Sequence, residues 1–299
     1  MFLLYIVYSM NFVIICMVLP LFITAIATNQ LSFSGGGAFG AVEIGILKRV
    51  YEDDSTNYDR YTGISAGGLN AGFLSHYEKI HDGIIAAEKL YSNIRNHDIY
   101  EALPETGNSL LNTHPLSKTL TNIISTMSSP PVIDTLIGTV NLNTGNLDTY
   151  TYDHHLTTDN KVRLLMSTSA IPIVFPPVKF NDYFYADGGT LSNELLDVIH
   201  SSTYLNITYI SPYGPMDEND ADISSLKEMV TRTFQIVKRN YNNPFSKLNH
   251  DCNIPYGEIT YYYVDKKHLH GYSMLNFDKG TDLIEIGYRN IVSKKYKLC

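Results

Sequence analysis

The chain has 299 residues, and its formal net charge of −8 at pH 7 argues against a nucleic-acid-binding protein, which needs a basic surface to neutralise phosphates. The same charge argues against simple electrostatic docking on anionic lipid. The length accommodates one large α/β core or two small domains. Because no repeat or low-complexity linker divides the chain, we expect a single domain over residues 28–299.

Residues 1–27 form an N-terminal hydrophobic leader. Phe2 to Ala27 is almost wholly apolar, and the first charged side chain of the chain is Glu43. The small-residue end Ala25-Ile26-Ala27 fits a cleaved signal peptide, whereas the lack of a basic residue and the length of the run fit an uncleaved membrane anchor. We slightly favour the signal peptide, and both interpretations predict a protein that enters the secretory pathway or associates with a membrane.

After the leader, the pattern predicts a strand–helix–strand unit followed by another helix. Leu31 to Phe33 is a short buried strand, Ala41 to Tyr51 has apolar residues at helical spacing, Asp59 to Ile64 forms a second strand, and a helix opens at Ala66. A unit of this length joins two parallel strands. The turns that follow the two strands therefore meet at one edge of the sheet, where open α/β sheets bind ligands.

The turn after the first strand, Ser34-Gly35-Gly36-Gly37-Ala38-Phe39-Gly40, has three interpretations. Three of its glycines match a dinucleotide-binding fingerprint, but the second strand ends in Gly63-Ile64-Ser65 instead of the acidic residue that this fingerprint needs about 20 positions on. A plain tight turn would not need three consecutive glycines, which are costly in chain entropy. We favour a row of backbone N–H groups, from Gly36, Gly37 and Ala38, that stabilises an oxyanion.

Two further motifs predict the chemistry. Gly63-Ile64-Ser65-Ala66-Gly67 has the G-x-S-x-G pattern of a nucleophile elbow, in which the glycines allow a sharp turn and leave the Ser65 hydroxyl exposed at a helix N-terminus. Later in the chain, the predicted strand Tyr183 to Ala186 ends at Asp187-Gly188-Gly189 and so presents a carboxylate at a strand end. An oxyanion loop, a serine and a carboxylate are the groups required to cleave an ester through an acyl-enzyme.

As an ordered set, these motifs resemble the patatin-like phospholipase family. Two further segments extend the resemblance, namely Asn143-Thr144-Gly145 and Ser167 to Pro172 with Phe175-Pro176-Pro177. Together the matching segments cover roughly Gln30 to Leu196. The chain departs from the family pattern at Phe39, where the glycine loop often carries arginine, so the loop contributes backbone donors without that positive charge.

The resemblance implies a three-layer α/β fold with a mostly parallel central sheet and the nucleophile elbow at the carboxyl edge of the strands. It implies a lipid acyl hydrolase of the phospholipase A or lysophospholipase type, which acts on phospholipid or another acyl lipid at a membrane surface and needs no cofactor. Ser65 is implied as the nucleophile and Asp187 as the base of a Ser-Asp dyad. The other implied site residues are the oxyanion-hole residues Gly35, Gly36, Gly37 and Ala38 and the motif glycines Gly40, Gly63, Gly67, Gly188 and Gly189.

Other chemistry-bearing segments give weaker signals. Thr106 to Ser129 mixes amphipathic helix and turn, which suits either a lid over an acyl pocket or an outer helix packed on the sheet. Adjacent His154 and His155 would point to opposite faces of a strand, so we expect a polar loop and no metal site. Cys252 and Cys299 are the only cysteines after the leader; they can pair in an oxidising compartment or remain free thiols in the cytosol.

Two alternative functions stay open. An α/β-hydrolase-type esterase would use a Ser-Asp-His triad, although more chain than one strand–helix–strand unit should then separate its oxyanion loop from its elbow. A non-catalytic lipid-binding or storage protein on the same fold would not need both Ser65 and Asp187. The histidines available to a triad are His200, His250, His268 and His270.

Overall fold

The computed structural model describes residues 28–102, 107–195, 205–214, 229 and 257–298. The leader over residues 1–27, Cys252 and Cys299 lie outside these ranges, so the predictions made for them stay predictions. Within the described ranges, none of the helices has the length and apolar character needed to cross a bilayer.

The secondary structure of the described residues alternates between strands and helices. The strands are β1 Thr28–Phe33, β2 Arg60–Ile64, β3 Glu101–Ala102, β4 Leu111–Asn112, β5 Asp134–Asn141, β6 Leu147–Thr151, β7 Val178–Phe180, β8 Tyr183–Asp187, β9 Leu205–Ile210, β10 Gly257–Val264 and β11 Ile291–Leu298. The α-helices are α1 Gly40–Asp53, α2 Ala66–Leu74, α3 Ile80–Asn93, α4 Asn96–Ile99, α5 His114–Thr126, α6 Thr158–Thr168 and α8 Gly280–Arg289. The strands and helices expected around both glycine motifs, and the strand before Asp187, are confirmed.

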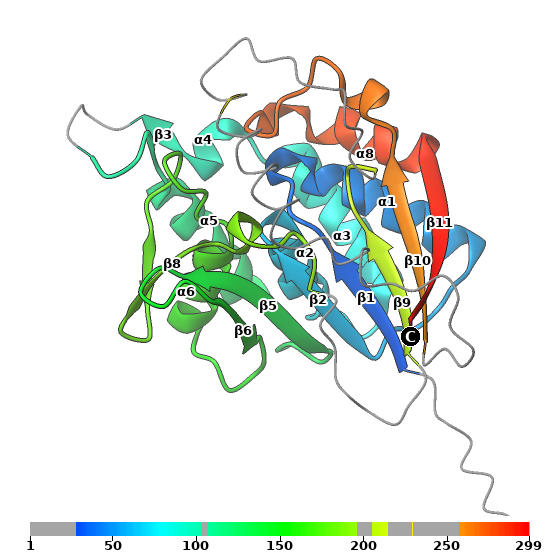
Figure 1. The fold of residues 1–299 in the computed structure, drawn as a ribbon, viewed down its shortest axis with the longest axis horizontal. Coiled ribbons are helices and arrows are strands. Elements are labelled where there is room, and N and C mark those ends of the chain that lie inside the picture. Colours follow the sequence, from blue (N-terminus) through cyan, green and yellow to red (C-terminus); the bar gives the residue numbers. More distant parts are fainter. Residues whose placement is uncertain (1–27, 103–106, 196–204, 215–228, 230–256, 299) are drawn as a thin grey trace, which may run out of the picture.

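A mixed sheet of nine strands forms the centre of the molecule (Figure 1). Its order is β11-β10-β9-β1-β2-β5-β8-β7, with β6 paired to β5. The central strands β10, β9, β1, β2 and β5 are mutually parallel, and the strands at both edges pair antiparallel. The predicted α/β class with its parallel core is therefore confirmed, and the antiparallel strand β8 is the one that carries Asp187.

The described helices pack beside this sheet in two tiers. Helices α1, α2 and α6 contact the strands directly, while α3 packs on α1 and α2, and α5 packs on α4 and α6 (Figure 1). Helix α8 lies against α1, and the close fit between them depends on Gly45 and Gly287, which face backbone of the opposite helix. The described part of the segment Thr106 to Ser129 contains the helix α5, which packs on α4 and α6.

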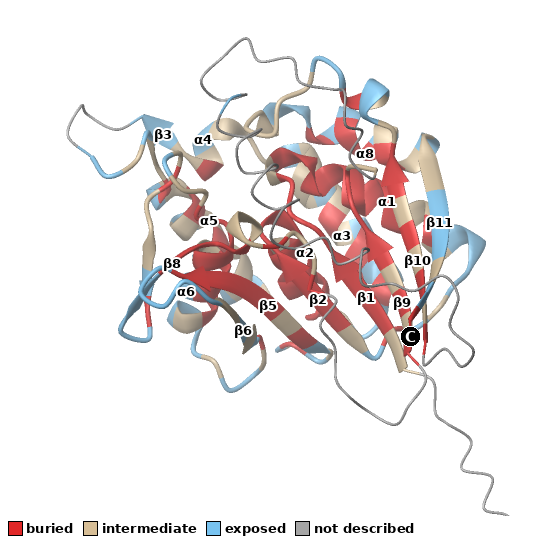
Figure 2. Cartoon of the chain, in the orientation of Figure 1, coloured by how far each residue is buried: buried red, intermediate tan, exposed pale blue. Residues whose placement is uncertain are grey.

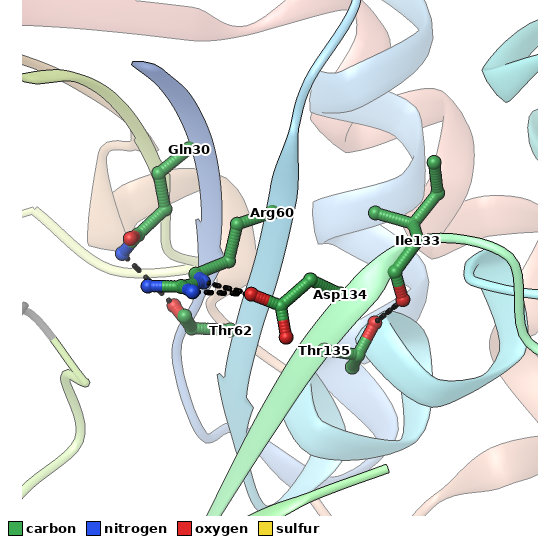
Figure 3. Close-up of polar contacts among 6 residues, drawn as sticks. All are labelled: Gln30, Arg60, Thr62, Ile133, Asp134 and Thr135. Carbon is green, nitrogen blue, oxygen red and sulfur yellow. Dashed lines mark hydrogen bonds and ion pairs between the residues drawn. The ribbon is translucent and has the colours of Figure 1, made fainter. Parts of the chain in front are cut away.

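The alternation of side chains along β1 separates two environments. Leu31 and Phe33 belong to the apolar core shared with α1, whereas Gln30 and Ser32 lie on the other face with Thr62 of β2. Gln30 Nε2 donates to Thr62 Oγ1 at 3.3 Å (Figure 3). Figure 2 shows that the central strands are buried along most of their length, so the Gln30 Nε2 group and the two hydroxyls pair with one another inside the protein. Among the described residues, the other amide atom of Gln30, Oε1, is buried without a hydrogen-bond partner.

An ion pair joins the amino ends of β2 and β5. The guanidinium of Arg60 donates to Asp134 Oδ2, with a distance of 2.6 Å from Nε (Figure 3). The two residues are register partners in the parallel pairing. This pair lies at the edge opposite to the carboxyl ends of the strands, away from the predicted site.

The fold predicts a sharp difference between two glycines of α2. An alanine Cβ at Gly67 would collide with the backbone of Phe33 and Ser34, whereas at Gly72 it would meet the flexible end of Leu165 at 3.0 Å. We expect Gly67→Ala to destabilise the protein by about 1–3 kcal/mol or more, because the backbone of Phe33 and Ser34 cannot move aside. Gly72→Ala is the matched control and should stay within about 1 kcal/mol of wild type, since alanine also favours the helix. Urea unfolding measures both, and equal losses would contradict the packing argument.

Candidate active site

The glycine turn and Ser65 lie side by side at the carboxyl ends of neighbouring strands. In the β1–β2 pairing, Phe33 is aligned with Gly63. Gly35 and Ser65 each follow two residues later, so both leave the sheet at the same edge. A Cβ built on Gly35 would stand 3.0 Å from the Cβ of Ser65. The two predicted motifs are therefore in direct contact.

The backbone of Ser65 has a strained conformation. Its φ is 57° and its ψ is −128°, and it forms the N-cap of α2. A non-glycine residue in such a region is destabilised by about 1–3 kcal/mol and persists only where its surroundings hold it. Here the Ser65 N–H donates to Thr168 Oγ1 at 2.8 Å, and the Thr168 hydroxyl donates to the carbonyl of Gly138 at 2.6 Å. Thr168 therefore clamps the elbow to β5.

Ser65 and Asp187 are hydrogen-bonded directly. The Ser65 hydroxyl donates to Asp187 Oδ2 at 2.6 Å, and each residue is only 5% exposed. The other carboxylate oxygen, Oδ1, accepts the Gly189 N–H at 2.7 Å, and the Asp187 N–H donates to Ala170 at 2.8 Å. In the sheet, Asp187 is opposite Thr139, and Gly138 is opposite Ile64, which explains why the carboxylate reaches the level of the elbow. The arrangement can pass a proton from serine to carboxylate without an intermediary.

The glycine loop presents backbone N–H groups, with one correction to the prediction. Among the residues that the structure describes, the N–H groups of Gly35, Gly36 and Gly37 have no acceptor, whereas the Ala38 N–H donates to the Met274 carbonyl at 2.7 Å. Ala38 is therefore already engaged and drops out of the predicted donor set. Gly37 has a φ of +57°, and a side chain there would collide with Met274, so glycine is required at this point of the loop.

A buried glutamate, Glu43, lies behind the glycine loop. It is the first charged residue of the chain, yet the structure buries it completely. Its carboxylate accepts the Ser34 N–H at 3.0 Å on one oxygen and Asn70 Nδ2 at 2.9 Å on the other. Burial raises the pKa of Glu43 well above its ordinary value, and these hydrogen bonds offset part of that rise.

Glu43 belongs to a hydrogen-bonded network that joins three helices to the loop. Asn70 of α2 also donates to the Gly40 carbonyl of α1 at 3.1 Å and accepts the Tyr91 hydroxyl of α3 at 2.8 Å. The sequence signal that could have suggested this role is an acidic residue in the first turn of a helix, next to a glycine loop, where the helix dipole favours negative charge.

The described histidines lie apart from the serine and the carboxylate. His268 and His270 follow β10, and no hydrogen bond joins either side chain to Ser65 in the part of the chain that the structure describes. His200 and His250 lie outside the described residues. His154 and His155 are exposed in a turn, and within the described ranges no group of three or more His, Cys, Asp or Glu side chains is placed to hold a metal ion.

An apolar cavity lies between the glycine loop and helices α2, α3 and α5. Gly37 lines it, together with Leu69, Asn70 and Phe73 of α2 and with residues of α3 and α5. Its volume is about 70 Å³. Helix α5, predicted either as a lid over an acyl pocket or as an outer helix, is one wall of this cavity.

Comparison with known proteins identifies the family. A family model described as "Patatin-like phospholipase" matches residues 31–199, which is more than half of the chain. The chain belongs to the patatin-like phospholipase family. Membership in the patatin-like family supports lipid acyl hydrolysis as its activity. No curated protein matches the sequence significantly.

Two solved structures are similar to this patatin-like chain at low identity. The crystal structure of VipD from Legionella pneumophila shares 11% identity with a TM-score of 0.42, and the match covers 89% of this chain and 68% of VipD. The structure of the heterodimeric ExoU–SpcU complex from the type III secretion system of Pseudomonas aeruginosa shares 12% identity with a TM-score of 0.31. That match covers 90% of this chain and 53% of the other chain, so this chain spans about half of its length.

The clamp on Ser65 predicts a specific loss in Thr168→Val. Valine keeps the shape of threonine but leaves the Ser65 N–H and the Gly138 carbonyl without partners, which should destabilise the protein by about 1–3 kcal/mol and lower kcat more than it raises KM. Thr135→Val is the matched control, because that hydroxyl donates only to the Ile133 carbonyl at the far end of β5 (Figure 3). Urea unfolding and steady-state kinetics test the pair. An unchanged kcat in Thr168→Val would show that the clamp does not act on the nucleophile.

The buried Glu43 predicts a pH-dependent stability difference. The folded-state pKa of Glu43 lies above 4.5, the ordinary value for a glutamate, so the folded protein holds a proton that the unfolded chain releases. The free energy of unfolding of the wild type therefore falls as pH rises from 4.5 through the folded-state pKa. Glutamine does not titrate. The free energy of unfolding of Glu43→Gln minus that of wild type should therefore increase with pH, whatever its offset. Urea unfolding over a pH series measures it, with the exposed Glu78→Gln as control; parallel curves would contradict the prediction.

Proposed function

We propose that this chain is a lipid acyl hydrolase that cleaves carboxylic esters through an acyl-enzyme on Ser65, with Asp187 as the general base of a dyad. The observation that carries the proposal is the direct 2.6 Å hydrogen bond from the Ser65 hydroxyl to Asp187, formed beside unengaged backbone donors. A nucleophile within hydrogen-bond reach of its base is the arrangement that nucleophilic catalysis requires.

The acylation step follows from these positions. The Ser65 oxygen attacks the ester carbonyl carbon, and its proton moves to Asp187 Oδ2. The carbonyl oxygen becomes an oxyanion, which the N–H groups of Gly36 and Gly37 stabilise. When the tetrahedral intermediate collapses, the bond to the alcohol breaks, and Asp187 returns the proton to the leaving oxygen.

Deacylation reverses these roles with water. Asp187 accepts a proton from a water molecule, whose oxygen attacks the acyl carbonyl, and the second intermediate releases the carboxylic acid as the proton returns to Ser65 Oγ. The Gly189 N–H keeps the carboxylate oriented by binding the oxygen that does not contact serine. Every proton is thus carried by one carboxylate, and the chemistry needs no cofactor.

The cavity supports an acyl lipid as the substrate. Its lining is mostly apolar, and its polar side chains already have partners inside the protein. Asn70 bonds to Tyr91, His76 bonds to Tyr152, and the Thr119 hydroxyl donates to the Asp98 carbonyl. These side chains therefore do not need a hydrogen bond from a ligand, and such a lining suits an aliphatic chain. We propose phospholipids as the lipid class, in line with the family.

Two alternatives are less well supported. A Ser-Asp-His triad would place an imidazole between Ser65 and Asp187, where the two residues are instead in direct contact. The strained backbone at Ser65 is destabilising, and such strain is typical of functional sites. A non-catalytic lipid-binding protein would have no need for it.

The first test of the proposal is covalent labelling. A fluorophosphonate probe should label the wild-type protein, and Ser65→Ala should abolish labelling and phospholipid hydrolysis because the nucleophile is gone. Ser169→Ala is the matched control, since that nearby serine donates only to carbonyls of its own helix and should leave labelling intact. Labelling that persists in Ser65→Ala would move the nucleophile elsewhere.

The second part of the same test concerns the base. Asp187→Asn keeps the size of the side chain but cannot accept the proton, so the rate should fall by at least about 10³-fold. Replacement of His200, His250, His268 or His270 by alanine should leave most of the activity. A folded histidine variant without activity would establish the triad instead.

A further inference from the structure

We propose that Asn96 and Tyr100, at the start of α4 and directly after its end, are positioning residues for the oxyanion donors, an inference that rests on the acyl-hydrolase function proposed above. Both residues bind the segment of residues 273–278, and the Met274 carbonyl of this segment binds the glycine loop. Neither residue belongs to the glycine loop, the nucleophile elbow or the Asp187 motif.

The first argument is that the glycine loop needs support from outside. Three consecutive glycines have no side chains that could pack, and glycine has more conformational freedom than any other residue. Glu43 supplies one outside contact, through the N–H of Ser34 at the start of the loop. The Met274 carbonyl supplies another at the far end, where it accepts the Ala38 N–H at 2.7 Å and leaves no room for a side chain on Gly37.

The second argument is that the 273–278 segment is folded back on itself. The Asn276 N–H donates to the Ser273 carbonyl at 2.9 Å, which closes a turn around Met274. The Asn276 side chain in turn accepts the Asp278 N–H at 3.2 Å. Because these bonds connect both ends of the segment to its middle, a shift of the end at Asp278 also shifts the Met274 carbonyl.

The third argument is that α4 holds this segment at several points. Asn96 Oδ1 accepts the Phe277 N–H at 2.7 Å, and Asn96 Nδ2 donates to Asp278 Oδ2 at 2.8 Å. The Asn96 N–H donates to the other carboxylate oxygen of Asp278 at 3.0 Å. The Tyr100 hydroxyl donates to the Leu275 carbonyl at 2.8 Å. Since hydrogen bonds to a carboxylate are among the stronger ones, α4 fixes where the segment lies.

An exchange of two side chains tests the proposal on the full-length protein. Asn96→Asp sets two carboxylates against each other, and Asp278→Asn sets two amide N–H groups against each other, so each single variant disrupts the contact. In the double variant the amide at position 278 can donate to the carboxylate at position 96. The backbone N–H groups of Asn96 and Phe277 also keep their acceptors there.

The expected effect is on kcat, because the oxyanion forms only in the transition state. With p-nitrophenyl butanoate, each single variant should lower kcat about 10-fold and leave KM within about twofold. This loss is smaller than the roughly 10²–10³-fold loss that follows removal of an oxyanion donor, since the donors are displaced but still present. The double variant should recover kcat to within about threefold of wild type, as expected for two residues that act through one contact.

Two further variants complete the set. Tyr100→Phe removes only the hydroxyl that binds Leu275, so kcat should fall by about threefold with KM unchanged. Asn93→Asp is the matched control, because it makes the same charge change shortly before α4, where the amide donates to the Lys89 carbonyl within α3. Its kcat should stay within about twofold of wild type. Labelling with a fluorophosphonate to completion counts the active sites, so poor folding of a variant does not alter its kcat.

Single variants that keep the wild-type kcat would overturn the proposal. A double variant as slow as the single variants would also overturn it, since the loss would then not come from this contact. An equal loss in Asn93→Asp would do the same, because added charge alone would explain the effect. Absence of hydrolysis and labelling in the wild type would instead overturn the function proposed for Ser65.

Discussion

The close approach of three backbone segments around Ser65 is the constraint on which the rest of the site depends. Gly67 packs directly on the backbone of Phe33 and Ser34 at the end of β1. The first turn of α2 therefore lies in close backbone contact with the start of the glycine loop. This contact forces the chain to turn abruptly at Ser65, with a φ of 57°. The hydrogen bond from its N–H to Thr168 holds the strained residue against β5, and its hydroxyl donates to Asp187. The strain at Ser65, the packing of Gly67 and the hydrogen bond to Asp187 thus belong to one arrangement.

A second constraint acts on the glycine loop from behind. A buried carboxyl group is destabilising unless donors surround it, and Glu43 has donors from both Ser34 and Asn70. Because these donors belong to the loop and to α2, the glutamate can be satisfied only when the loop and the nucleophile helix are correctly placed. The network thus adds little net stability, but it holds the loop in one position. Oxyanion donors must be fixed in this way if they are to be preorganised.

Local patterns in the sequence were sufficient to predict the elements around the site. The alternation around Leu31 and Phe33, the helical spacing after Ala41 and the two glycine motifs depend on neighbours within a few residues, which is the range that periodicity reports. The meeting of the glycine turn with Ser65 was also predictable, because parallel strands present their carboxyl ends at one edge. The partners of Ser65 and of the loop could not be predicted in the same way, since they are distant in sequence.

Thr168 illustrates that limit. The segment around it was recognised as a motif, but its role arises from the packing of the end of α6 against β5, which no local pattern specifies. The burial of Glu43 depends likewise on α2 and α3 closing over α1, and the engagement of the Ala38 N–H depends on Met274, far along the chain. Each of these is a tertiary contact that overrides the local preference of the residue.

Helix α2 connects the chemistry to the recognition of substrate. Its first turn carries the strained serine, and the face that continues from Ser65 through Leu69 and Phe73 lines the apolar cavity. An acyl chain that binds along this face is aligned with the nucleophile by the helix itself, so contacts far from the ester can position the carbonyl without any movement of the site. Binding energy from the non-reacting part of a substrate can then contribute to orientation at the reacting atoms. In the proposed mechanism, the packing of α2 on β1, β2 and β5 would couple recognition of the acyl chain to ester cleavage.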